Sequence, residues 1–245
     1  MRIVVAGGTG LVGRHTVEAA RERGHDVTVL ARSRGADVLT GSGLTDAVAG
    51  ADALIDVTNI TTLSATTATE FFETATRNML AAEEKAGVAH HVALSIVGID
   101  GIDASYYAGK LAQERMVAAS AVPSTIARAG QFHEFAGQLL AQQHGSIAVM
   151  PTLLMRPVAA REVGEHLVRV AEAGPVGRAQ DIVGPRDEIL VDVARRQVAA
   201  DGIRRAVLQL RLPGAYGRGL ASGSLRGTPD ALQGELTFDD WLATH

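Results

Sequence analysis

The sequence predicts an α/β fold: a doubly wound parallel sheet with helices on both faces and a small lobe towards the C-terminus. In the first half, short apolar runs typical of buried strands alternate with longer amphipathic runs typical of helices. That pattern loosens after about residue 143. With 245 residues, of which 47% are hydrophobic and 20% charged, the chain can bury the core of a single folded unit.

The expected elements follow one another without a long linker. The apolar run 2–6 stops at glycines, and the amphipathic stretch 11–23 ends at Gly24. A helix expected at 107–120 cannot continue through Pro123. The other expected strands are 26–31, 36–39, 53–57, 91–95, 124–128 and 181–185; the other helices are 67–86, 158–172, 189–200 and 237–242; and 217–227, rich in Gly, Ser and Arg, is expected to be a mobile loop.

A glycine-rich turn joins the first strand to the first helix. It reads Gly7-Gly8-Thr9-Gly10-Leu11-Val12-Gly13, so that Gly8, Gly10 and Gly13 have the spacing G-x-G-x-x-G. One glycine permits the tight turn, one lets backbone N–H groups approach a pyrophosphate, and one allows the helix to pack closely on the strand. The helix N-terminus adds the positive end of its dipole. We expect residues 7–13 to bind a dinucleotide; the alternative is a turn that uses glycine for packing alone.

The end of the second strand indicates which dinucleotide is bound. An NAD site usually has a carboxylate here for the ribose 2′-hydroxyl, but this strand is followed by Arg32-Ser33-Arg34. Two guanidinium groups and a hydroxyl suit a 2′-phosphate, because arginine offers bidentate, charge-assisted hydrogen bonds. The sequence therefore predicts NADP(H) in preference to NAD(H). The alternative is that both arginines are solvated loop charges.

A Tyr–Lys pair lies at the start of the helix expected at 107–120. Ser95 ends a predicted strand, Tyr106 follows 11 residues later, and Lys110 lies four residues beyond it. On a helix, that spacing puts the tyrosine and the lysine on one face. An ammonium beside a phenol lowers the phenol's pKa, and only Lys85 and Lys110 are lysines in this arginine-rich chain. The alternative is a packed tyrosine next to a solvated lysine.

These motifs resemble the short-chain dehydrogenase/reductase superfamily, and specifically its atypical, NmrA-like branch. The resemblance covers about residues 1 to 135 and implies a Rossmann-like fold, NADP(H) or NAD(H), and reductase or isomerase activity in many members. Some NmrA-like proteins lack the tyrosine and act as nucleotide-sensing regulators. The segments that carry the resemblance are residues 7–13, Arg32, Val92-Ala93-Leu94-Ser95-Ile96-Val97-Gly98, Tyr106 with Lys110, and Thr125-Ile126-Ala127-Arg128-Ala129-Gly130-Gln131-Phe132.

The resemblance implies roles for the three candidate catalytic residues. Tyr106 would donate a proton to the developing oxyanion, and Lys110 would lower the phenol's pKa and hold the nicotinamide ribose. Ser95 would hydrogen-bond the substrate oxygen. Hydride would pass between the cofactor and a small carbonyl, imine or quinone-like substrate. Tyr107 is the alternative working phenol.

We expect one domain over residues 1–245, with a cofactor-binding core at 1–143 and mostly a substrate lobe at 144–245. Further cofactor contacts are expected where strands end, at Val57, Thr58 and Gln131. Tyr107, Phe132 and His133 are expected to line the substrate pocket, although Phe132 is equally a candidate core aromatic.

Three functions are compatible with these motifs. The leading hypothesis is an NADP(H)-dependent oxidoreductase acting on a small molecule. Its rival from another class is a regulator that senses NADP(H) and binds a protein partner without turnover. The third is an isomerase or epimerase that retains its cofactor. Either a monomer or a homodimer is compatible with the resemblance.

Composition argues against other classes. The 23 basic and 27 acidic residues give a net charge of −4, and aromatic residues are few, so that nucleic-acid binding is not expected. Without cysteine, a signal-like start or a long apolar run, we expect a cytoplasmic protein that does not enter membranes. His90 and His91 lack partners at metal-ligand spacing and are expected at the surface, and residues 83–85 are expected to form a solvated helix face.

Overall fold

A computed structural model describes residues 1–244 and divides them into two compact units. The first unit comprises Met1–Ser95, Ala104–Arg128 and Ala160–Gln180. The second comprises Ile96–Asp103, Ala129–Ala159 and residues 181–244. No helix in the described part of the chain is long and apolar enough to cross a membrane.

A parallel sheet forms the centre of the first unit, in the order β5-β4-β3-β1-β2. Residues 3–6, in an interior strand of this sheet, are fully buried, because strands covered on both faces need apolar side chains on both sides. The order in which strands are added switches at β1: β2 lies on one side of it, and β3, β4 and β5 follow on the other. Open α/β sheets bind ligands at this switch point, between β1 and β3. The strands are β1 (Arg2–Ala6), β2 (Asp26–Leu30), β3 (Ala53–Asp56), β4 (His90–Ile96) and β5 (Ser124–Ala129), with the short β8 (Gly177–Arg178) beside β5.

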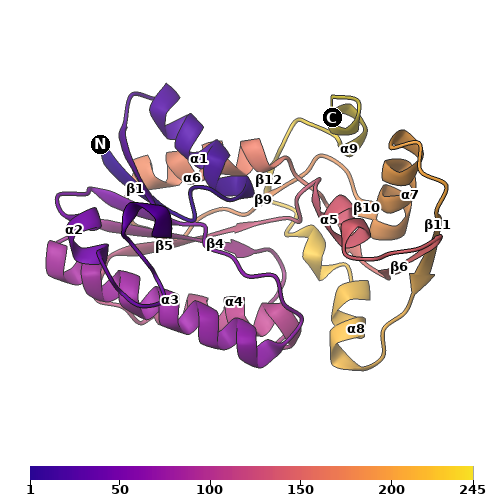
Figure 1. Cartoon of the computed structure of the whole chain (residues 1–245), viewed down its shortest axis with the longest axis horizontal. Helices are drawn as coiled ribbons and strands as arrows, with labels where there is room; N and C mark the ends of the chain where they lie inside the picture. Colours follow the sequence, from indigo (N-terminus) through magenta and orange to yellow (C-terminus); the bar gives the residue numbers. More distant parts are fainter. Residues whose placement is uncertain (245) are drawn as a thin grey trace. The chain divides into compact units, whose positions relative to one another are not determined.

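Helices cover both faces of this sheet (Figure 1). On one face α1 (Leu11–Glu22) packs against α6 (Ala160–Ala173), and on the other α3 (Ala65–Ala86) packs against α4 (Ser105–Ala118). Two glycines permit these approaches. A Cβ on Gly164 of α6 would lie 2.7 Å from the Thr16 nitrogen in α1, and a Cβ on Gly109 of α4 would lie 2.6 Å from the Ala68 carbonyl carbon in α3. The short α2 (Leu44–Val48) also packs on α3.

The second unit contains three short strand pairs and four helices among its described residues. Its C-terminal helix begins at Thr237, whose side chain accepts a hydrogen bond from the Asp240 N–H, and it buries Phe238 and Trp241. The strand pairs are β6 (Ile147–Pro151) with β11 (Ala206–Leu210), β7 (Leu154–Met155) with β10 (Glu188–Ile189), and β9 (Ile182–Val183) with β12 (Leu232–Gln233); the helices are α5 (Phe135–Ala141), α7 (Leu190–Ala200), α8 (Gly214–Ala221) and α9 (Phe238–Leu242).

The α/β class, the parallel sheet and most predicted elements are confirmed, but the strand expected at 36–39 is wrong. The segment turns instead, because the Asp37 carboxylate accepts a hydrogen bond from the Leu39 N–H. The carbonyl groups of Val38 and Leu39 accept hydrogen bonds from the Asn78 amide of α3, at 2.9 Å each, so they are not free to pair with a strand.

The loop expected at 217–227 is also wrong, because this segment contributes to a core. Most of it lies in α8 and in a 3₁₀ turn at Ser224–Arg226. Leu220 and Leu225 are buried, and each anchors its helical segment. The glycine content indicated flexibility, whereas the two buried leucines hold the segment in place.

His90, His91 and Glu83 were expected in water, and all three are buried. The His91 Nδ1 lies 2.9 Å from a Glu83 carboxylate oxygen, and the His90 Nε2 lies 2.8 Å from the Thr125 hydroxyl. Helix α3 therefore turns Glu83 towards the sheet, where it pairs with a histidine of β4. A buried pair of this kind is costly to break, because the remaining partner is left without compensation.

Replacing Glu83 with Gln should destabilise the fold in a pH-dependent way. Burial lowers the pKa of His91, but the Glu83 carboxylate more than offsets this and raises the pKa above its ordinary value. Such a group contributes stability below its unfolded pKa of about 6.5 and loses it as the pH rises through the folded value. In urea denaturation, Glu83→Gln should lower the free energy of unfolding by about 3–5 kcal/mol at about pH 6 and by clearly less at about pH 9. An equal loss at both pH values would contradict a charged His91.

Candidate cofactor and catalytic site

The glycine-rich turn is packed so tightly that side chains are excluded from two of its positions. Gly7 has φ of +81°, and a Cβ there would lie 2.7 Å from the Val57 carbonyl oxygen. A Cβ on Gly13 would lie 2.1 Å from the Gly7 carbonyl oxygen. At Gly8 the space for a side chain is restricted by other side chains, since a Cβ there would lie 2.9 Å from a methyl group of Val29. The turn thus lies directly against the segment that follows β3.

The start of α1 is open to an anion. Thr9 and Gly10 are exposed, and a Cβ on Gly10 would meet only the Gly7 oxygen, at 3.3 Å. Gly10 is the N-cap of the helix, and it has no side chain to accept a hydrogen bond from the first helical N–H groups, which belong to Leu11, Val12 and Gly13. No acidic residue occupies the first turn. Backbone donors and the positive end of the helix dipole therefore coincide, as phosphate binding requires.

Arg32, Ser33 and Arg34 form an exposed 3₁₀ turn directly after β2. Within residues 1–244, neither arginine forms an ion pair with an acidic side chain. Gly35 follows with φ of +83° and ends the turn. Both guanidinium groups are therefore available to an anionic ligand at the edge of the first unit.

Thr58 lies at the carboxyl end of β3, where Asp56 fixes the chain. The Asp56 carboxylate accepts a hydrogen bond of 2.8 Å from the Thr58 N–H, and Asp56 itself is fully buried. Thr58 is buried too, and its hydroxyl has no hydrogen-bond partner in the described part of the chain. Val57 is partly exposed. A buried hydroxyl without a partner is a candidate contact for a ligand.

Ser95 occupies the equivalent position near the end of β4. It is 2% exposed, and its hydroxyl likewise has no hydrogen-bond partner among residues 1–244. His91, Ala93 and Ser95 alternate along one side of the strand, so Ser95 points to the same face as the His91–Glu83 pair, which α3 covers. This is also the face on which α4 packs.

Tyr106 lies in the first turn of α4 and is held by Asn59. Its hydroxyl donates a hydrogen bond of 2.6 Å to the Asn59 side-chain oxygen, and its ring packs edge-to-face on Phe72, with 5.6 Å between centroids. The preceding Ser105 has φ of +53°, an uncommon value outside glycine, and its hydroxyl donates to the Leu63 carbonyl. Burial first, and then the Asp56 carboxylate, raise the pKa of Tyr106 well above its ordinary value.

Lys110 is buried at 4% exposure, one turn after Tyr106. Its ammonium donates to the Gln113 side-chain oxygen and lies 4.4 Å from the centre of the Phe72 ring. Burial lowers the pKa of Lys110 to about 8, against the opposing effect of Asp56 and Glu114. The expected lowering of the Tyr106 pKa by this lysine is not found in this structure: burial and the Asp56 carboxylate both raise that pKa.

The other residues predicted for the substrate pocket differ in exposure. Tyr107 is 6% exposed and packs beside Tyr106, with 6.2 Å between ring centroids. Gln131, Phe132 and His133 belong to the second unit. Gln131 is 8% exposed, Phe132 is partly exposed, and His133 is fully buried.

His133 anchors the C-terminal helix within the second unit. Its ring lies 5.8 Å from that of Phe238 and 5.7 Å from that of Trp241, and its Nε2 lies 3.0 Å from the Leu236 carbonyl oxygen. These contacts give the imidazole a packing role that the sequence analysis did not foresee.

Three polar residues of the site escaped the sequence analysis. Asp56 is the one charged residue of an apolar strand, Asn59 follows it closely, and Gln113 lies three residues after Lys110 on the same helical face. The Gln113 amide nitrogen donates a hydrogen bond of 2.7 Å to Asp56. The acid in an otherwise apolar strand was the signal that could have found this group.

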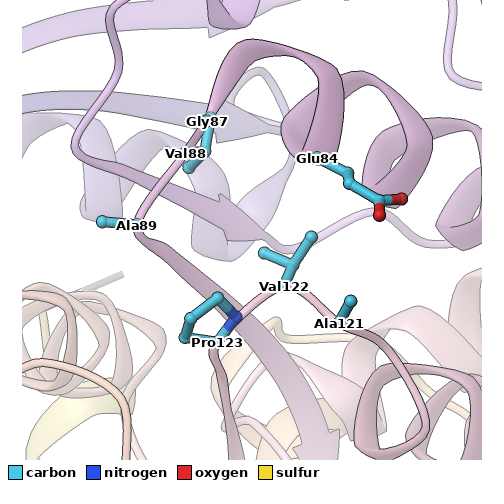
Figure 2. A pocket seen from close by; sticks show the side chains of 7 residues that line it. All are labelled: Glu84, Gly87, Val88, Ala89, Ala121, Val122 and Pro123. Carbon is cyan, nitrogen blue, oxygen red and sulfur yellow. The ribbon is translucent and has the colours of Figure 1, made fainter.

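A hollow on the surface of the first unit lies away from these residues (Figure 2). Its lining comes from the segments that precede β4 and β5, so it opens at the amino ends of those strands, whereas ligands of parallel sheets bind at the carboxyl ends. Glu84 is the single charged side chain of the seven shown. The lining residues are Glu84, Gly87, Val88, Ala89, Ala121, Val122 and Pro123.

The comparisons agree with this geometry. Residues 7–172 match the family described as NAD(P)H-binding, which is more than half of the chain. No curated protein matches the sequence. The protein MoeE5, solved with UDP-glucose and NAD, has a TM-score of 0.74 at 18% identity, covering 100% of this chain and 97% of its own. An NADPH-dependent quinone oxidoreductase of Escherichia coli, solved with NADPH, has a TM-score of 0.76 at 18% identity and 99% coverage of both chains.

A nucleoside-diphosphate-sugar epimerase of Staphylococcus aureus has a TM-score of 0.74 at 13% identity, covering 99% of each chain. At these identities, the solved structures establish the Rossmann-like fold and not a shared substrate. The fold and the glycine-rich turn define a nicotinamide-nucleotide-binding protein, as the resemblance predicted. The chain belongs to the NAD(P)H-binding family.

Two alanine substitutions in the glycine-rich turn should separate binding from folding. Gly10→Ala adds a methyl group on the open side of the turn, so NADPH affinity should fall at least tenfold while stability drops by only about 1 kcal/mol, the cost of a poorer N-cap. Gly13→Ala forces a methyl group onto the Gly7 carbonyl and should cost about 1–3 kcal/mol of stability. Calorimetric titration and thermal denaturation measure the two effects. Unchanged NADPH affinity in Gly10→Ala would place the phosphates elsewhere.

Proposed function

We propose that the protein is an NADP(H)-dependent oxidoreductase that transfers hydride to or from a small carbonyl, imine or quinone-like substrate. The observation that carries the proposal is the position of Ser95, Tyr106 and Lys110. Ser95 lies at the carboxyl end of β4, and the other two lie on the helix that covers the same face of the sheet. In parallel α/β sheets this edge holds the ligand.

The cofactor preference rests on the turn after β2. Arg32 and Arg34 are exposed and carry no acidic partner within residues 1–244, and the turn contains no acid for a ribose 2′-hydroxyl. Guanidinium groups there favour the 2′-phosphate of NADP(H). When bound, the nicotinamide supplies or accepts the hydride. The pyrophosphate would lie on the open N-terminus of α1, and Thr58 would contact the cofactor through its unpartnered hydroxyl.

The protein's own groups suit proton donation. The Tyr106 phenol holds its proton at neutral pH and can give it to an oxygen that gains negative charge. Its raised pKa makes it a weaker acid than a free phenol, so that donation needs positive charge beside the phenol. The Ser95 hydroxyl, which has no protein partner in the described chain, can donate a hydrogen bond to the same oxygen. The Lys110 ammonium contributes positive charge and hydrogen-bond donors for the phenol or a ribose hydroxyl.

A second candidate is an isomerase or epimerase that retains its cofactor. The likeness to a nucleoside-diphosphate-sugar epimerase favours it, and the same tyrosine could serve as acid and base. Such an enzyme would convert its substrate without any net change in nicotinamide absorbance. The Tyr106–Lys110 pair favours either enzyme over a regulator without turnover.

Replacing Tyr106 with Phe tests the proton donor. With a ketone, imine or quinone substrate found by screening NADPH oxidation, Tyr106→Phe should lower kcat about 10²- to 10⁴-fold. Tyr107→Phe is the matched control and should retain activity within a few-fold, because it removes a neighbouring hydroxyl of the same helix. The reverse ranking of the two variants would assign the role to Tyr107.

Replacing Arg32 with Ala tests the cofactor preference. Removing one charged hydrogen-bond donor should weaken NADPH binding about 10- to 100-fold and leave NADH binding nearly unchanged, in fluorescence titrations. Arg21→Ala, an exposed arginine in the last turn of α1, is the control and should change neither affinity. Equal weakening of both nucleotides by Arg32→Ala would contradict recognition of the 2′-phosphate.

A further inference from the structure

A buried hydrogen-bonded chain links Lys110 to the segment after β3. The Lys110 ammonium donates to the Gln113 side-chain oxygen, and the Gln113 amide nitrogen donates to one Asp56 oxygen at 2.7 Å. The other Asp56 oxygen accepts from the Thr58 N–H at 2.8 Å. Lys110, Gln113 and Asp56 are each at most 4% exposed. Bulk solvent therefore does not reach these groups.

The chemistry of this chain requires an amide at position 113. An ammonium only donates and a carboxylate only accepts, so the group between them must accept on one side and donate on the other. A glutamine side chain does both, and its two charged neighbours fix which way its amide points. An apolar residue would leave the buried ammonium without its acceptor and one oxygen of the buried Asp56 carboxylate without its donor.

The amide also keeps Lys110 out of a direct ion pair. No Lys110–carboxylate contact within 4.0 Å is present in residues 1–244, although Asp56 and Glu114 both act on its charge. Glu114 is occupied by Arg128, at 2.7 and 2.6 Å. Of the three ammonium N–H donors, the described residues engage one by a hydrogen bond, with Phe72 beneath the charge. Donors therefore remain for a phenol or a ribose hydroxyl.

We propose that Gln113 is a positioning residue that holds the Lys110 ammonium through Asp56 and so sets where that charge lies in the nucleotide site. The proposal rests on the proposed function for the role of Lys110 itself. The Asp56 carboxylate that anchors Gln113 also fixes Thr58, in the segment against which Gly7 packs. Asp56 thus holds both Gln113, which contacts Lys110, and the segment that packs against the glycine-rich turn.

Other ionisable groups near this chain are already paired or restrained. From α4 these are Glu114, which pairs with Arg128 of β5, and Tyr106, which donates to Asn59. From α3 and β4 come Glu83 and His91, which pair with each other. Gln113 is therefore the one side chain of the described site that hydrogen-bonds both Lys110 and Asp56.

Lysine labelling offers a direct test, because the chain has only two lysines. Protein carrying lysine labelled with ¹³C at Cε should give two signals, and exposed Lys85 is an internal reference. In a pH titration by NMR, Lys110 should titrate near the pKa of about 8 that burial gives it. In Gln113→Met, loss of the hydrogen-bond acceptor should lower the pKa of Lys110 further, because that hydrogen bond favours the charged ammonium.

Val117→Ala is the matched control. Val117 is fully buried on the same helix, in a cluster with Ala93 and Ile126, so its truncation loosens α4 without touching the hydrogen-bonded chain. The Lys110 titration should not move in this variant. An unchanged Lys110 titration in Gln113→Met, or an equal change in Val117→Ala, would overturn the positioning role.

A second measurement needs no variant and protects the test against a Gln113→Met protein that does not fold. In the unsubstituted protein, nuclear Overhauser contacts should join the Lys110 ε-methylene to the Phe72 ring, because the ammonium lies 4.4 Å from the ring centre. Absence of these contacts would overturn the position on which the proposal depends.

The proposed function can fail separately. If the Lys110 titration responds to Gln113→Met as expected, but Lys110→Ala binds NADPH and turns over substrate normally, Gln113 still positions the lysine and the catalytic role of Lys110 is wrong. If Lys110→Ala is impaired and Gln113→Met leaves the Lys110 titration unchanged, the positioning role is wrong and the proposed function stands.

Discussion

The close approach of two backbone turns is the constraint on which the rest of the site depends. Gly7 lies so near the Val57 carbonyl that no side chain fits between them, and Gly13 folds back on Gly7 in the same way. This packing brings the loops after β1 and β3 together at the switch point of the strand order. It also leaves the start of α1 without a side-chain cap, next to exposed Gly10, so that backbone N–H groups are free for phosphates.

The layer between the sheet and helices α3 and α4 contains several buried charged groups. It holds the Glu83–His91 and Glu114–Arg128 pairs and the chain through Gln113. Burying these groups is costly, and pairing them offsets that cost without making the layer more stable than an apolar one. These polar contacts fix the orientation of α4, because each polar group reaches its partner in one arrangement only. Tyr106 and Lys110 therefore hold defined positions.

The sequence was sufficient for features with local signals. The glycine-rich turn, the alternation of strands and helices and the Tyr–Lys spacing depend on neighbours within a few residues, and the resulting fold is confirmed. Features that join distant residues could not be predicted. Gln113 and Asp56 are 57 positions apart, and the Glu83 carboxylate finds His91 only once α3 packs on β4. Likewise, only the folded chain shows that Gly164 lets α6 pack on α1.

Amide hydrogen exchange, measured with and without NADPH, tests whether the start of α1 holds the phosphates of a nicotinamide nucleotide. Saturating NADPH should slow exchange at Leu11, Val12 and Gly13, the first N–H groups of the helix, because each gains an acceptor. Unchanged exchange at these residues, with NADPH bound, would contradict phosphate binding there and reduce the glycine-rich turn to a device for packing.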